Sequence, residues 1–508
     1  MPETSWAQIG GMGSSWSRGN KAAGPTSGRG WSKEARTALL IVCLGQFLTQ
    51  MDLTVVNVAI HAIRSGLHTS VALVSWVVDA YFLTFAALML VFGDLGDRRG
   101  RRRVFSTGLV AFSAASAACG LAPGVDVLIA ARAAQGVAGA AVLVSSLSLL
   151  SATFPDRSQR AAAIGWWTSV SGVALVTGPL IGGAVVMWFG WRTVFLINVP
   201  IALAGAVAAK RKLPESRDVT ARRADLKGAT ALVAVLGTLS VSLSLGPQRG
   251  WTSGVVITGL GATVVSLVAL AAVERRSSAP LIPLGLLAHR GLLAANTAAS
   301  LVNFATLGLI FLLSAYFEEV GHLGPLQSGE RLAPMFLAYM AASAASGVLS
   351  AKLGSRWPSV AGLSLAALAA TALQFSAATG SHSLGSAGVG VVVVLVLAGT
   401  GVGLSLPAVV SAAVGAVSGP RAGLASGLNN TSRQVGGTLG VALLGGLIAV
   451  SPAAGMPAAL SVVALAYVAG AAVMLVGWTA HRDQERVPRP ESESERAGVL
   501  TASSGSHP

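Results

Sequence analysis

Charged side chains are scarce in this chain. Asp, Glu, Lys and Arg make up 11% of its 508 residues, whereas hydrophobic residues make up 53%. A soluble domain carries about 25% charged residues, so the composition excludes an ordinary water-soluble globule, a disordered chain and a coiled coil. Lipid is the alternative solvent, and helices can span it because they satisfy their own backbone hydrogen bonds. We therefore expect an all-α polytopic membrane protein.

Several kinds of chemistry are also missing. The chain has two cysteines, Cys43 and Cys119, in separate apolar runs, which argues against a disulfide framework and favours packing as small hydrophobic residues. We find no Gly-x-x-x-x-Gly-Lys-Ser/Thr phosphate loop, no clustered metal ligands and no set of nucleophile, base and orienting residue. The sequence therefore predicts neither an enzyme nor a metal or cofactor site.

Long apolar runs dominate the rest of the chain, and each is close to the length of about 20 residues that crosses a bilayer as a helix. Residues 1–35 are instead rich in Gly and Ser and lack the apolar core of a signal peptide, so we expect a disordered tail. Fourteen spans are predicted, at residues 36–62, 71–92, 104–122, 127–153, 161–188, 193–209, 227–245, 254–273, 292–316, 332–350, 358–378, 388–411, 422–449 and 457–479.

The basic residues follow the predicted topology. With the amino terminus inside, 29 of the 35 Lys and Arg residues lie in inner segments or, like Arg36 and Lys227, at the inner end of a span; four lie in outer loops and two lie deep within spans. This bias predicts a multi-pass protein of the cell membrane with both termini in the cytoplasm. The net charge of +15 therefore indicates topology and contact with the anionic lipid bilayer, and no nucleic-acid partner.

A short internal repeat suggests that the chain has two related halves. Pro155 lies nineteen positions after Gly136, and Pro420 lies nineteen positions after Gly401. Parallel repeats of this kind are typical of transporters. We predict a disordered cytoplasmic tail at 1–35, a six-helix bundle at 36–209, a cytoplasmic linker with two inserted helices at 210–291, a second six-helix bundle at 292–480 and a cytoplasmic tail at 481–508.

Four strongly charged residues fall deep within predicted spans: Asp52, Asp79, Arg132 and Arg433. A charge at the bilayer centre costs about 2.5–3.5 kcal/mol or more, so each is a functional candidate. Asp52, Asp79 and Arg132 lie in the outer half of the first bundle, and we assign them to proton coupling. The alternative is a buried ion pair that only fixes helix packing.

Polar residues also follow one face of the first span. Gln46, Gln50, Thr54 and Asn57 lie within about 80° of one another on an ideal helix, and Asp52 lies nearly opposite them. The stripe is either part of a substrate pathway or a set of helix-to-helix hydrogen bonds. The predicted substrate pathway comprises Gln46, Gln50, Thr54, Asn57, Gln135, Asn429 and Arg433.

An inner loop carries the most specific motif. Residues 93–103 combine turn-forming glycines, carboxylates and five guanidinium groups, which could simply be a positive-inside anchor. The run resembles the loop between the second and third helices of the major facilitator superfamily, matched here by Gly93, Leu95, Gly96, Asp97, Arg98, Gly100, Arg101 and Arg102. The resemblance implies a gating loop, with roles for Gly93, Asp97, Arg98, Gly100 and Arg101.

Three further runs resemble the fourteen-helix drug:proton antiporter family within that superfamily. They are Met51–Ala59, then Leu128 with Arg132, Gln135 and Gly136, and finally Gly165, Gly178, Pro179, Gly182 and Gly183. Met51 replaces the usual Leu, and Ala174 stands where a Gly is usual. The resemblance covers residues 36–480 and implies an antiporter helix that contains Gly165, Gly178, Pro179 and Gly182.

The family resemblance implies a major-facilitator-like fold of two six-helix bundles plus two inserted helices. It further implies proton-coupled export of a small amphipathic drug or antibiotic by alternating access, as a monomer, with no cofactor and driven by the proton motive force. Two alternatives remain at this stage. One is proton-coupled uptake of a small nutrient, and the other is a transport-dead membrane sensor.

Overall fold

A computed structural model describes residues 31–217, 225–277, 289–323, 325–378, 388–417, 422–448 and 452–485. These residues form helices joined by short connections, and the described part contains no strand. The helices are α1 (Lys33–Gly66), α2 (Val71–Arg99), α3 (Arg101–Gly120), α4 (Val125–Thr153), α5 (Arg157–Phe189), α6 (Trp191–Leu196), α7 (Asn198–Lys212), α8 (Leu226–Arg249), α9 (Gly254–Arg276), α11 (Arg290–Glu319), α12 (Pro325–Leu353), α13 (Arg356–Ala378), α14 (Val389–Gly415), α15 (Ala422–Ile448) and α16 (Pro452–Glu485).

The predicted all-α membrane fold is confirmed. Each predicted span coincides with one helix, except that α6 and α7 share the sixth. Ten segments of the described chain are long and apolar enough to cross a membrane by length and composition alone. Helices α3, α5, α8 and α15 are outside that set, so the structure is compatible with fourteen spans and the number stays a prediction.

Short polar side chains begin several helices. Ser32 accepts a hydrogen bond from the Ala35 N–H at the start of α1, and Asp156 accepts one from the Gln159 N–H at the start of α5. Such caps satisfy backbone donors that a helix leaves free at its amino end. Hydrogen bonds from Ser158 and Gln159 also lower the pKa of Asp156, which keeps this loop carboxylate ionised as a cap.

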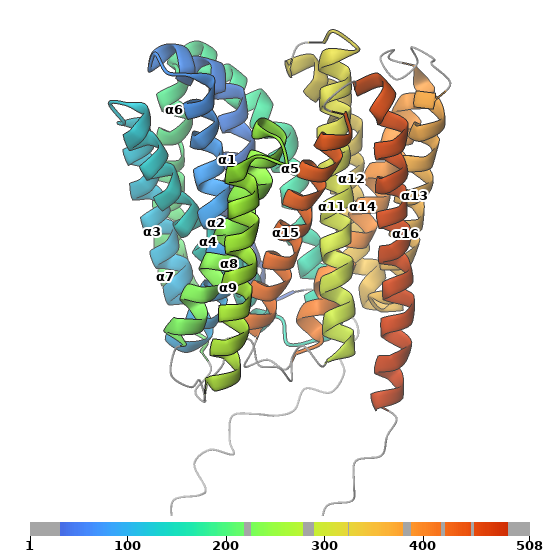
Figure 1. Ribbon diagram of the computed structural model, residues 1–508. Coiled ribbons are helices and arrows are strands. Elements are labelled where there is room, and N and C mark those ends of the chain that lie inside the picture. Colours follow the sequence, from blue (N-terminus) through green and yellow to red (C-terminus); the bar gives the residue numbers. More distant parts are fainter. Residues whose placement is uncertain are drawn as a thin grey trace, which may run out of the picture.

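The helices stand side by side in two groups (Figure 1). Helices α1 to α7 form one group and α11 to α16 form the other, while α8 and α9 pack on each other in front of the first group. Leu232 and Leu236 of α8 share an apolar cluster with Leu90 of α2 and Leu424 of α15. The inserted pair therefore lies against the seam between α2 and α15. The predicted domain boundaries stay a prediction.

The two groups contact each other through α2 with α15 and through α5 with α12. We call the end of the molecule that carries residues 93–103 the inner end. There a Cβ built on Gly427 of α15 would lie 3.0 Å from the Leu90 Cα, and one built on Gly165 of α5 would lie 2.7 Å from the Gly347 Cα of α12. Backbones this close leave no room for larger side chains, so the inner end is closed along both contacts.

Candidate functional site

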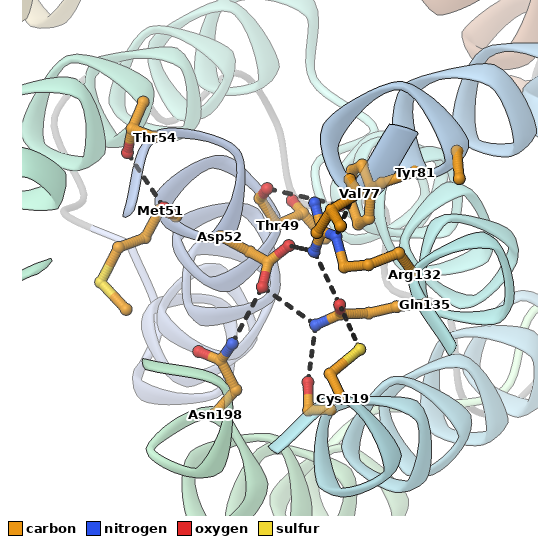
Figure 2. A network of polar contacts seen from close by, with 12 residues as sticks. Thr49, Met51, Asp52, Thr54, Val77, Tyr81, Cys119, Arg132, Gln135 and Asn198 are labelled. Atoms are coloured by element: carbon orange, nitrogen blue, oxygen red, sulfur yellow. Dashed lines mark hydrogen bonds and ion pairs between the residues drawn. The ribbon is translucent and has the colours of Figure 1, made fainter. Parts of the chain in front are cut away.

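The first group of helices contains a buried ion pair between Asp52 of α1 and Arg132 of α4 (Figure 2). The Arg132 Nη1 donates to the Asp52 Oδ2 at 2.5 Å, and both side chains are fully buried. The Asp52 Oδ1 accepts two more hydrogen bonds, from Gln135 Nε2 at 2.9 Å and from Asn198 Nδ2 at 3.1 Å. Three donors from α4 and α7 therefore surround this carboxylate.

Arg132 is held as firmly as its partner. Its Nε donates to the Val77 carbonyl of α2 at 2.9 Å, and its Nη1 also reaches the Gln135 Oε1 at 2.7 Å. The guanidinium carbon lies 4.4 Å from the centre of the Tyr81 ring, a distance typical of a cation–π contact. The Arg132 Nη2, in contrast, is buried without a hydrogen-bond partner.

Gln135 connects this pair to α3. Its Nε2 donates to the Ser116 Oγ at 2.7 Å, and its Oε1 accepts a weak hydrogen bond from the Cys119 thiol at 3.6 Å. Cys119 is buried and free, in keeping with the expected packing role. The network thus joins α1, α2, α3, α4 and α7 around one charge pair (Figure 2).

A buried pair of this kind is sensitive to the loss of either charge. Taking two ions out of water is costly, and removing one partner of such a pair costs about 3–5 kcal/mol because the other charge stays buried and unpaired. A proton that binds Asp52 would remove the negative charge and leave Arg132 in that position.

Asp79 lies apart from this network. It is a half-buried residue of α2, and within the described part of the chain no hydrogen bond or ion pair is found for it. Asp79 precedes Gly93 by fourteen residues, so the two share one helix face and lie about 21 Å apart along the axis. Gly93 meets Gly423 of α15 at the inner end. Asp79 is therefore on the face of α2 that turns toward the second group.

The polar stripe of the first span packs largely against α5. Gln46 Nε2 donates to the Ser171 Oγ at 2.6 Å, and the Thr54 hydroxyl donates to the Ala174 carbonyl at 3.3 Å. Thr54 points away from Asp52 in Figure 2, so the stripe and the ion pair use opposite faces of α1, as ideal helix angles indicate. Gln50 is half-buried, and the Asn57 side chain lies outside the described part. Their place in a substrate pathway stays a prediction.

The gating loop forms a contact between the two groups. The Asp97 Oδ1 accepts a hydrogen bond from the Gly423 N–H at 3.0 Å, and its Oδ2 accepts one from the Leu424 N–H at 3.0 Å. Both donors belong to the first turn of α15, where the helix dipole favours a negative charge. Asp97 is also paired with Arg101 at 2.7 Å. We call the contacts of Asp97 with α15 the inner latch.

Arg98 forms an ion pair with a carboxylate of α2. Its Nε donates to the Asp94 Oδ2 of its own helix at 2.6 Å, and its role in gating stays a prediction. Gly100 adopts a φ of +108° between α2 and α3, a conformation that L side chains rarely adopt. A Cβ there would lie 2.7 Å from the Glu215 carboxyl group.

Glu215 follows α7 and covers the start of α3. Its Oε1 accepts a hydrogen bond from the Arg102 N–H at 3.0 Å, and the Ser216 carbonyl accepts one from the Arg101 N–H at 3.0 Å. Arg102 in turn donates to the Leu213 carbonyl at 3.0 Å. The beginning of the linker is therefore attached to the gating loop, which sequence motifs did not indicate.

The glycines of α5 lie at helix contacts. Gly165 meets Gly347 of α12 at the inner end, whereas Gly178 and Gly182 meet Thr54 and Val55 of α1. The Pro179 side chain lies outside the described part. Gly165 therefore permits the contact between the two groups, and the other two permit close packing within the first group.

The second group has its own deep cation. Arg433 Nη1 is 3.5 Å from the Asn430 Oδ1, its Nε is buried without a hydrogen-bond partner, and no ion pair is found for it in the described part. Asn429 is fully buried and donates to the Asn296 Oδ1 of α11 at 3.1 Å. No contact of either residue with the Asp52 network is found among the described residues, and their role in substrate binding stays a prediction.

Sequence reasoning missed Asn198, Ser116, Tyr81 and Glu215. Asn198 is 1% exposed in an otherwise apolar segment, and a polar residue at that depth is a usable signal because it needs a partner. The roles of Ser116 and Tyr81 depend on tertiary packing, which periodicity does not reveal.

The geometry is that of a helical membrane transporter with a charge pair inside one bundle and a latch between two. The profile of the Major Facilitator Superfamily matches residues 42–441 and 332–504. The chain is 36% identical over 421 residues to the multidrug resistance protein Stp of Mycobacterium tuberculosis, covering 82% of this chain and 76% of that protein. It is 33% identical over 450 residues to a methylenomycin A resistance protein of Streptomyces coelicolor, covering 89% and 92%.

A solved structure agrees on the fold. The crystal structure of the human organic anion transporter MFSD10 superposes with a TM-score of 0.62 over 87% of this chain and 100% of that chain, at 15% identity. The chain belongs to the major facilitator superfamily, which confirms the resemblance seen in its motifs and makes it a multi-pass membrane transporter.

Proposed function

We propose that this protein is a proton-coupled secondary antiporter that exports small, amphipathic drugs or antibiotics from the cytoplasm. It would work as a monomer in the cell membrane, with both termini in the cytoplasm and without a cofactor. Relatives named for multidrug and methylenomycin A resistance support the substrate class. One proton crossing about 150 mV supplies roughly 3.5 kcal/mol, enough for a gradient of several hundredfold of a neutral solute.

The observation that carries the proposal is the Asp52–Arg132 pair. A transporter needs a group whose protonation changes which conformation is stable, and a buried pair supplies one because adding a proton leaves Arg132 unpaired. The pair also joins α1 to α4, and Asn198 of α7 is part of the same network. A proton on Asp52 would thus loosen three helices of one bundle at once.

The inner latch supports alternating access. Asp97 holds the first turn of α15 by two hydrogen bonds, and each of these connects one bundle to the other. Separation of the bundles at the inner end breaks both. In the inward-open state of the cycle we therefore expect Asp97 to leave α15, and a drug to enter from the cytoplasmic side.

Asp79 is the second candidate for the proton site. Unlike Asp52, it is half-buried and has no described hydrogen bond, so it could take up a proton without breaking an existing pair. Of the two carboxylates we favour Asp52, because a proton on Asp52 would break an ion pair, whereas no such pair is described for Asp79. Variants of the two carboxylates separate the candidates.

A susceptibility panel tests the function. Cells that express the protein should survive higher concentrations of some antibiotics, and a protonophore should abolish the difference. Energised cells should lose labelled drug, and a gain of labelled compound would indicate the uptake transporter instead. A sensor without transport activity would show neither change.

The orientation is tested by labelling. Arg103 is exposed at the start of α3, whereas Cys119 is buried and Cys43 is half-buried within α1. Arg103→Cys should therefore resist an impermeant thiol reagent in intact cells and react in inverted vesicles. Reaction in intact cells would place the latch on the outer side and overturn the direction of the cycle.

A further inference from the structure

A pocket of about 350 Å³ lies between α11 and α15, away from the Asp52 network. Its lining is formed by Leu292, Leu293, Asn296, Thr297, Ser300, Leu428, Thr431, Ser432 and Val435. Leu293 and Thr297 are exposed and lie one turn apart on α11, whereas Leu292, Asn296 and Thr431 are buried. The exposed pair marks an opening on the side of the bundle, and the buried residues form the inner wall.

The pocket lies in the inner half of the membrane. Leu293 comes three residues after the start of α11 at Arg290, and Val435 comes thirteen after the start of α15 at Ala422. At 1.5 Å per residue, the pocket begins about 5 Å from the inner ends of these helices and reaches about 20 Å from them toward the centre of the membrane. The hydrocarbon core is about 30 Å thick, so an opening at this height faces the inner leaflet.

Chemically, the lining is amphipathic and uncharged. Four side chains are aliphatic and five carry neutral hydroxyl or amide groups. Such a surface suits a ligand with an apolar body and a few neutral hydrogen-bonding groups. A permanent cation would lose its hydration here without gaining a counter-charge from the lining.

The state of the Thr431 side chain distinguishes this pocket from a simple gap in the packing. Its hydroxyl is buried and has no hydrogen-bond partner among the residues that the structure describes, although threonines in helices commonly donate to the carbonyl four residues earlier. An unpaired buried hydroxyl is destabilising. A hydrocarbon chain cannot supply the missing partner, whereas a polar group of a ligand can.

Helix α8 of the inserted pair lies close to the pocket. Leu428 packs against the cluster that α8 shares with α2 and α15, and also against the cluster of α11 with α14. The pocket is therefore beside the line where the inserted pair meets the second bundle.

We propose that this pocket is a binding site for an uncharged amphipathic molecule that arrives from the inner leaflet. It would hold the apolar part of the molecule against Leu292 and Leu428 and a neutral polar group beside Thr431. A drug and a diacylglycerol share this chemistry. The proposal rests on the export function only in the choice of a drug as one of the two probes.

The test uses the full chain in nanodiscs and a diazirine analogue of chloramphenicol, which is uncharged, aromatic and hydroxylated. Illumination should label peptides that contain residues 292–300 and 428–435. Thr431→Val keeps the volume and removes the hydroxyl, so we expect about ten-fold weaker equilibrium binding at this site, the effect of one lost hydrogen bond. Ser432→Leu fills the pocket and should abolish the labelling. Thr258→Val, on the exposed face of α9, is the matched control and should bind normally.

Competition identifies the source of the ligand. Excess chloramphenicol should displace the label. If diacylglycerol competes better than chloramphenicol, the natural ligand of this site is a lipid with the same amphipathic chemistry. Tetraphenylphosphonium should compete at least ten-fold less well. Equal competition by this cation, absence of label from both peptides, or unchanged labelling in Thr431→Val and Ser432→Leu would each overturn the proposal.

The result is independent of proton coupling. Asp52→Asn should label normally even though its transport fails. Labelling without any export would support this binding site and refute the export function. Export without labelling would support the export function and refute this binding site.

Discussion

The inner latch makes a quantitative prediction about the conformational equilibrium. Asp97→Asn removes the negative charge from the first turn of α15 and leaves one oxygen to accept one of the two N–H groups. A hydrogen bond to a charged group contributes about 1.5–3 kcal/mol, and the charge at a helix amino end about 0.3–1 kcal/mol more. We expect a loss of about 2 kcal/mol, which lowers the ratio of inner-closed to inner-open molecules about thirty-fold.

The assay is a distance measurement across the inner end. Spin labels at Arg103→Cys on α3 and Lys352→Cys on α12 use two exposed positions, one from each bundle. Electron–electron resonance in nanodiscs should show a short distance in the parent protein and a large longer-distance population in Asp97→Asn. Asp94→Asn is the matched control, because Asp94 is paired with Arg98 on its own helix. It should keep the parent distribution.

Arg101 must be considered separately, because Asp97→Asn also removes the ion pair between that guanidinium and Asp97. Arg101→Gln alone keeps both hydrogen bonds to α15, so its shift should be clearly smaller. Asp97→Asn with Arg101→Gln should shift as far as Asp97→Asn. If Asp97→Asn changes the ratio less than two-fold, Asp97 is part of a topology anchor and the latch reasoning is refuted.

Two glycine substitutions give further predictions. Gly165→Ala should reduce export strongly and favour the inner-open state, because the added Cβ would lie 2.7 Å from the Gly347 Cα and a backbone cannot give way cheaply. Gly261→Ala in α9 is the control with open space, and equal export by both variants would contradict the packing argument. Gly100→Ala should lower thermal stability by about 1–2 kcal/mol, since φ is +108° there. Replacing Glu215 by Ala as well should relieve only the steric part, and full recovery of the melting temperature would show that the backbone conformation carries no cost.

Part of this structure could be predicted from the sequence because the relevant physics is local. Scarce charge and long apolar runs require membrane helices, and the cost of a deep charge singles out Asp52, Asp79, Arg132 and Arg433 in any arrangement. Helix angles also placed Asp52 opposite Thr54, as the structure has it. The other contacts depend on how distant segments pack. Asn198 reaches Asp52 across 146 positions of the chain, which no spacing rule encodes.

In the gating loop, too, the sequence predicts one residue of the contact but not its partners. The motif identified Asp97, but its partners are backbone N–H groups at residues 423 and 424, whose side chains carry no signal. Glu215 belongs to a linker that seemed only basic and polar in sequence. Its function as a cap for α3 follows from the turn at Gly100 and the path of the chain after α7.

Proton movement in proteoliposomes tests the coupling site most directly. Addition of a drug that the susceptibility panel identifies as exported should change the internal pH of vesicles that contain the parent protein. Asp52→Asn should abolish this change, and so should Asp52→Asn with Arg132→Gln, which leaves no buried charge unpaired and so guards against simple misfolding. Asp79→Asn should still exchange drug for protons. Normal exchange in both Asp52 variants, with its loss in Asp79→Asn, would contradict the account and reduce the Asp52–Arg132 pair to a packing element.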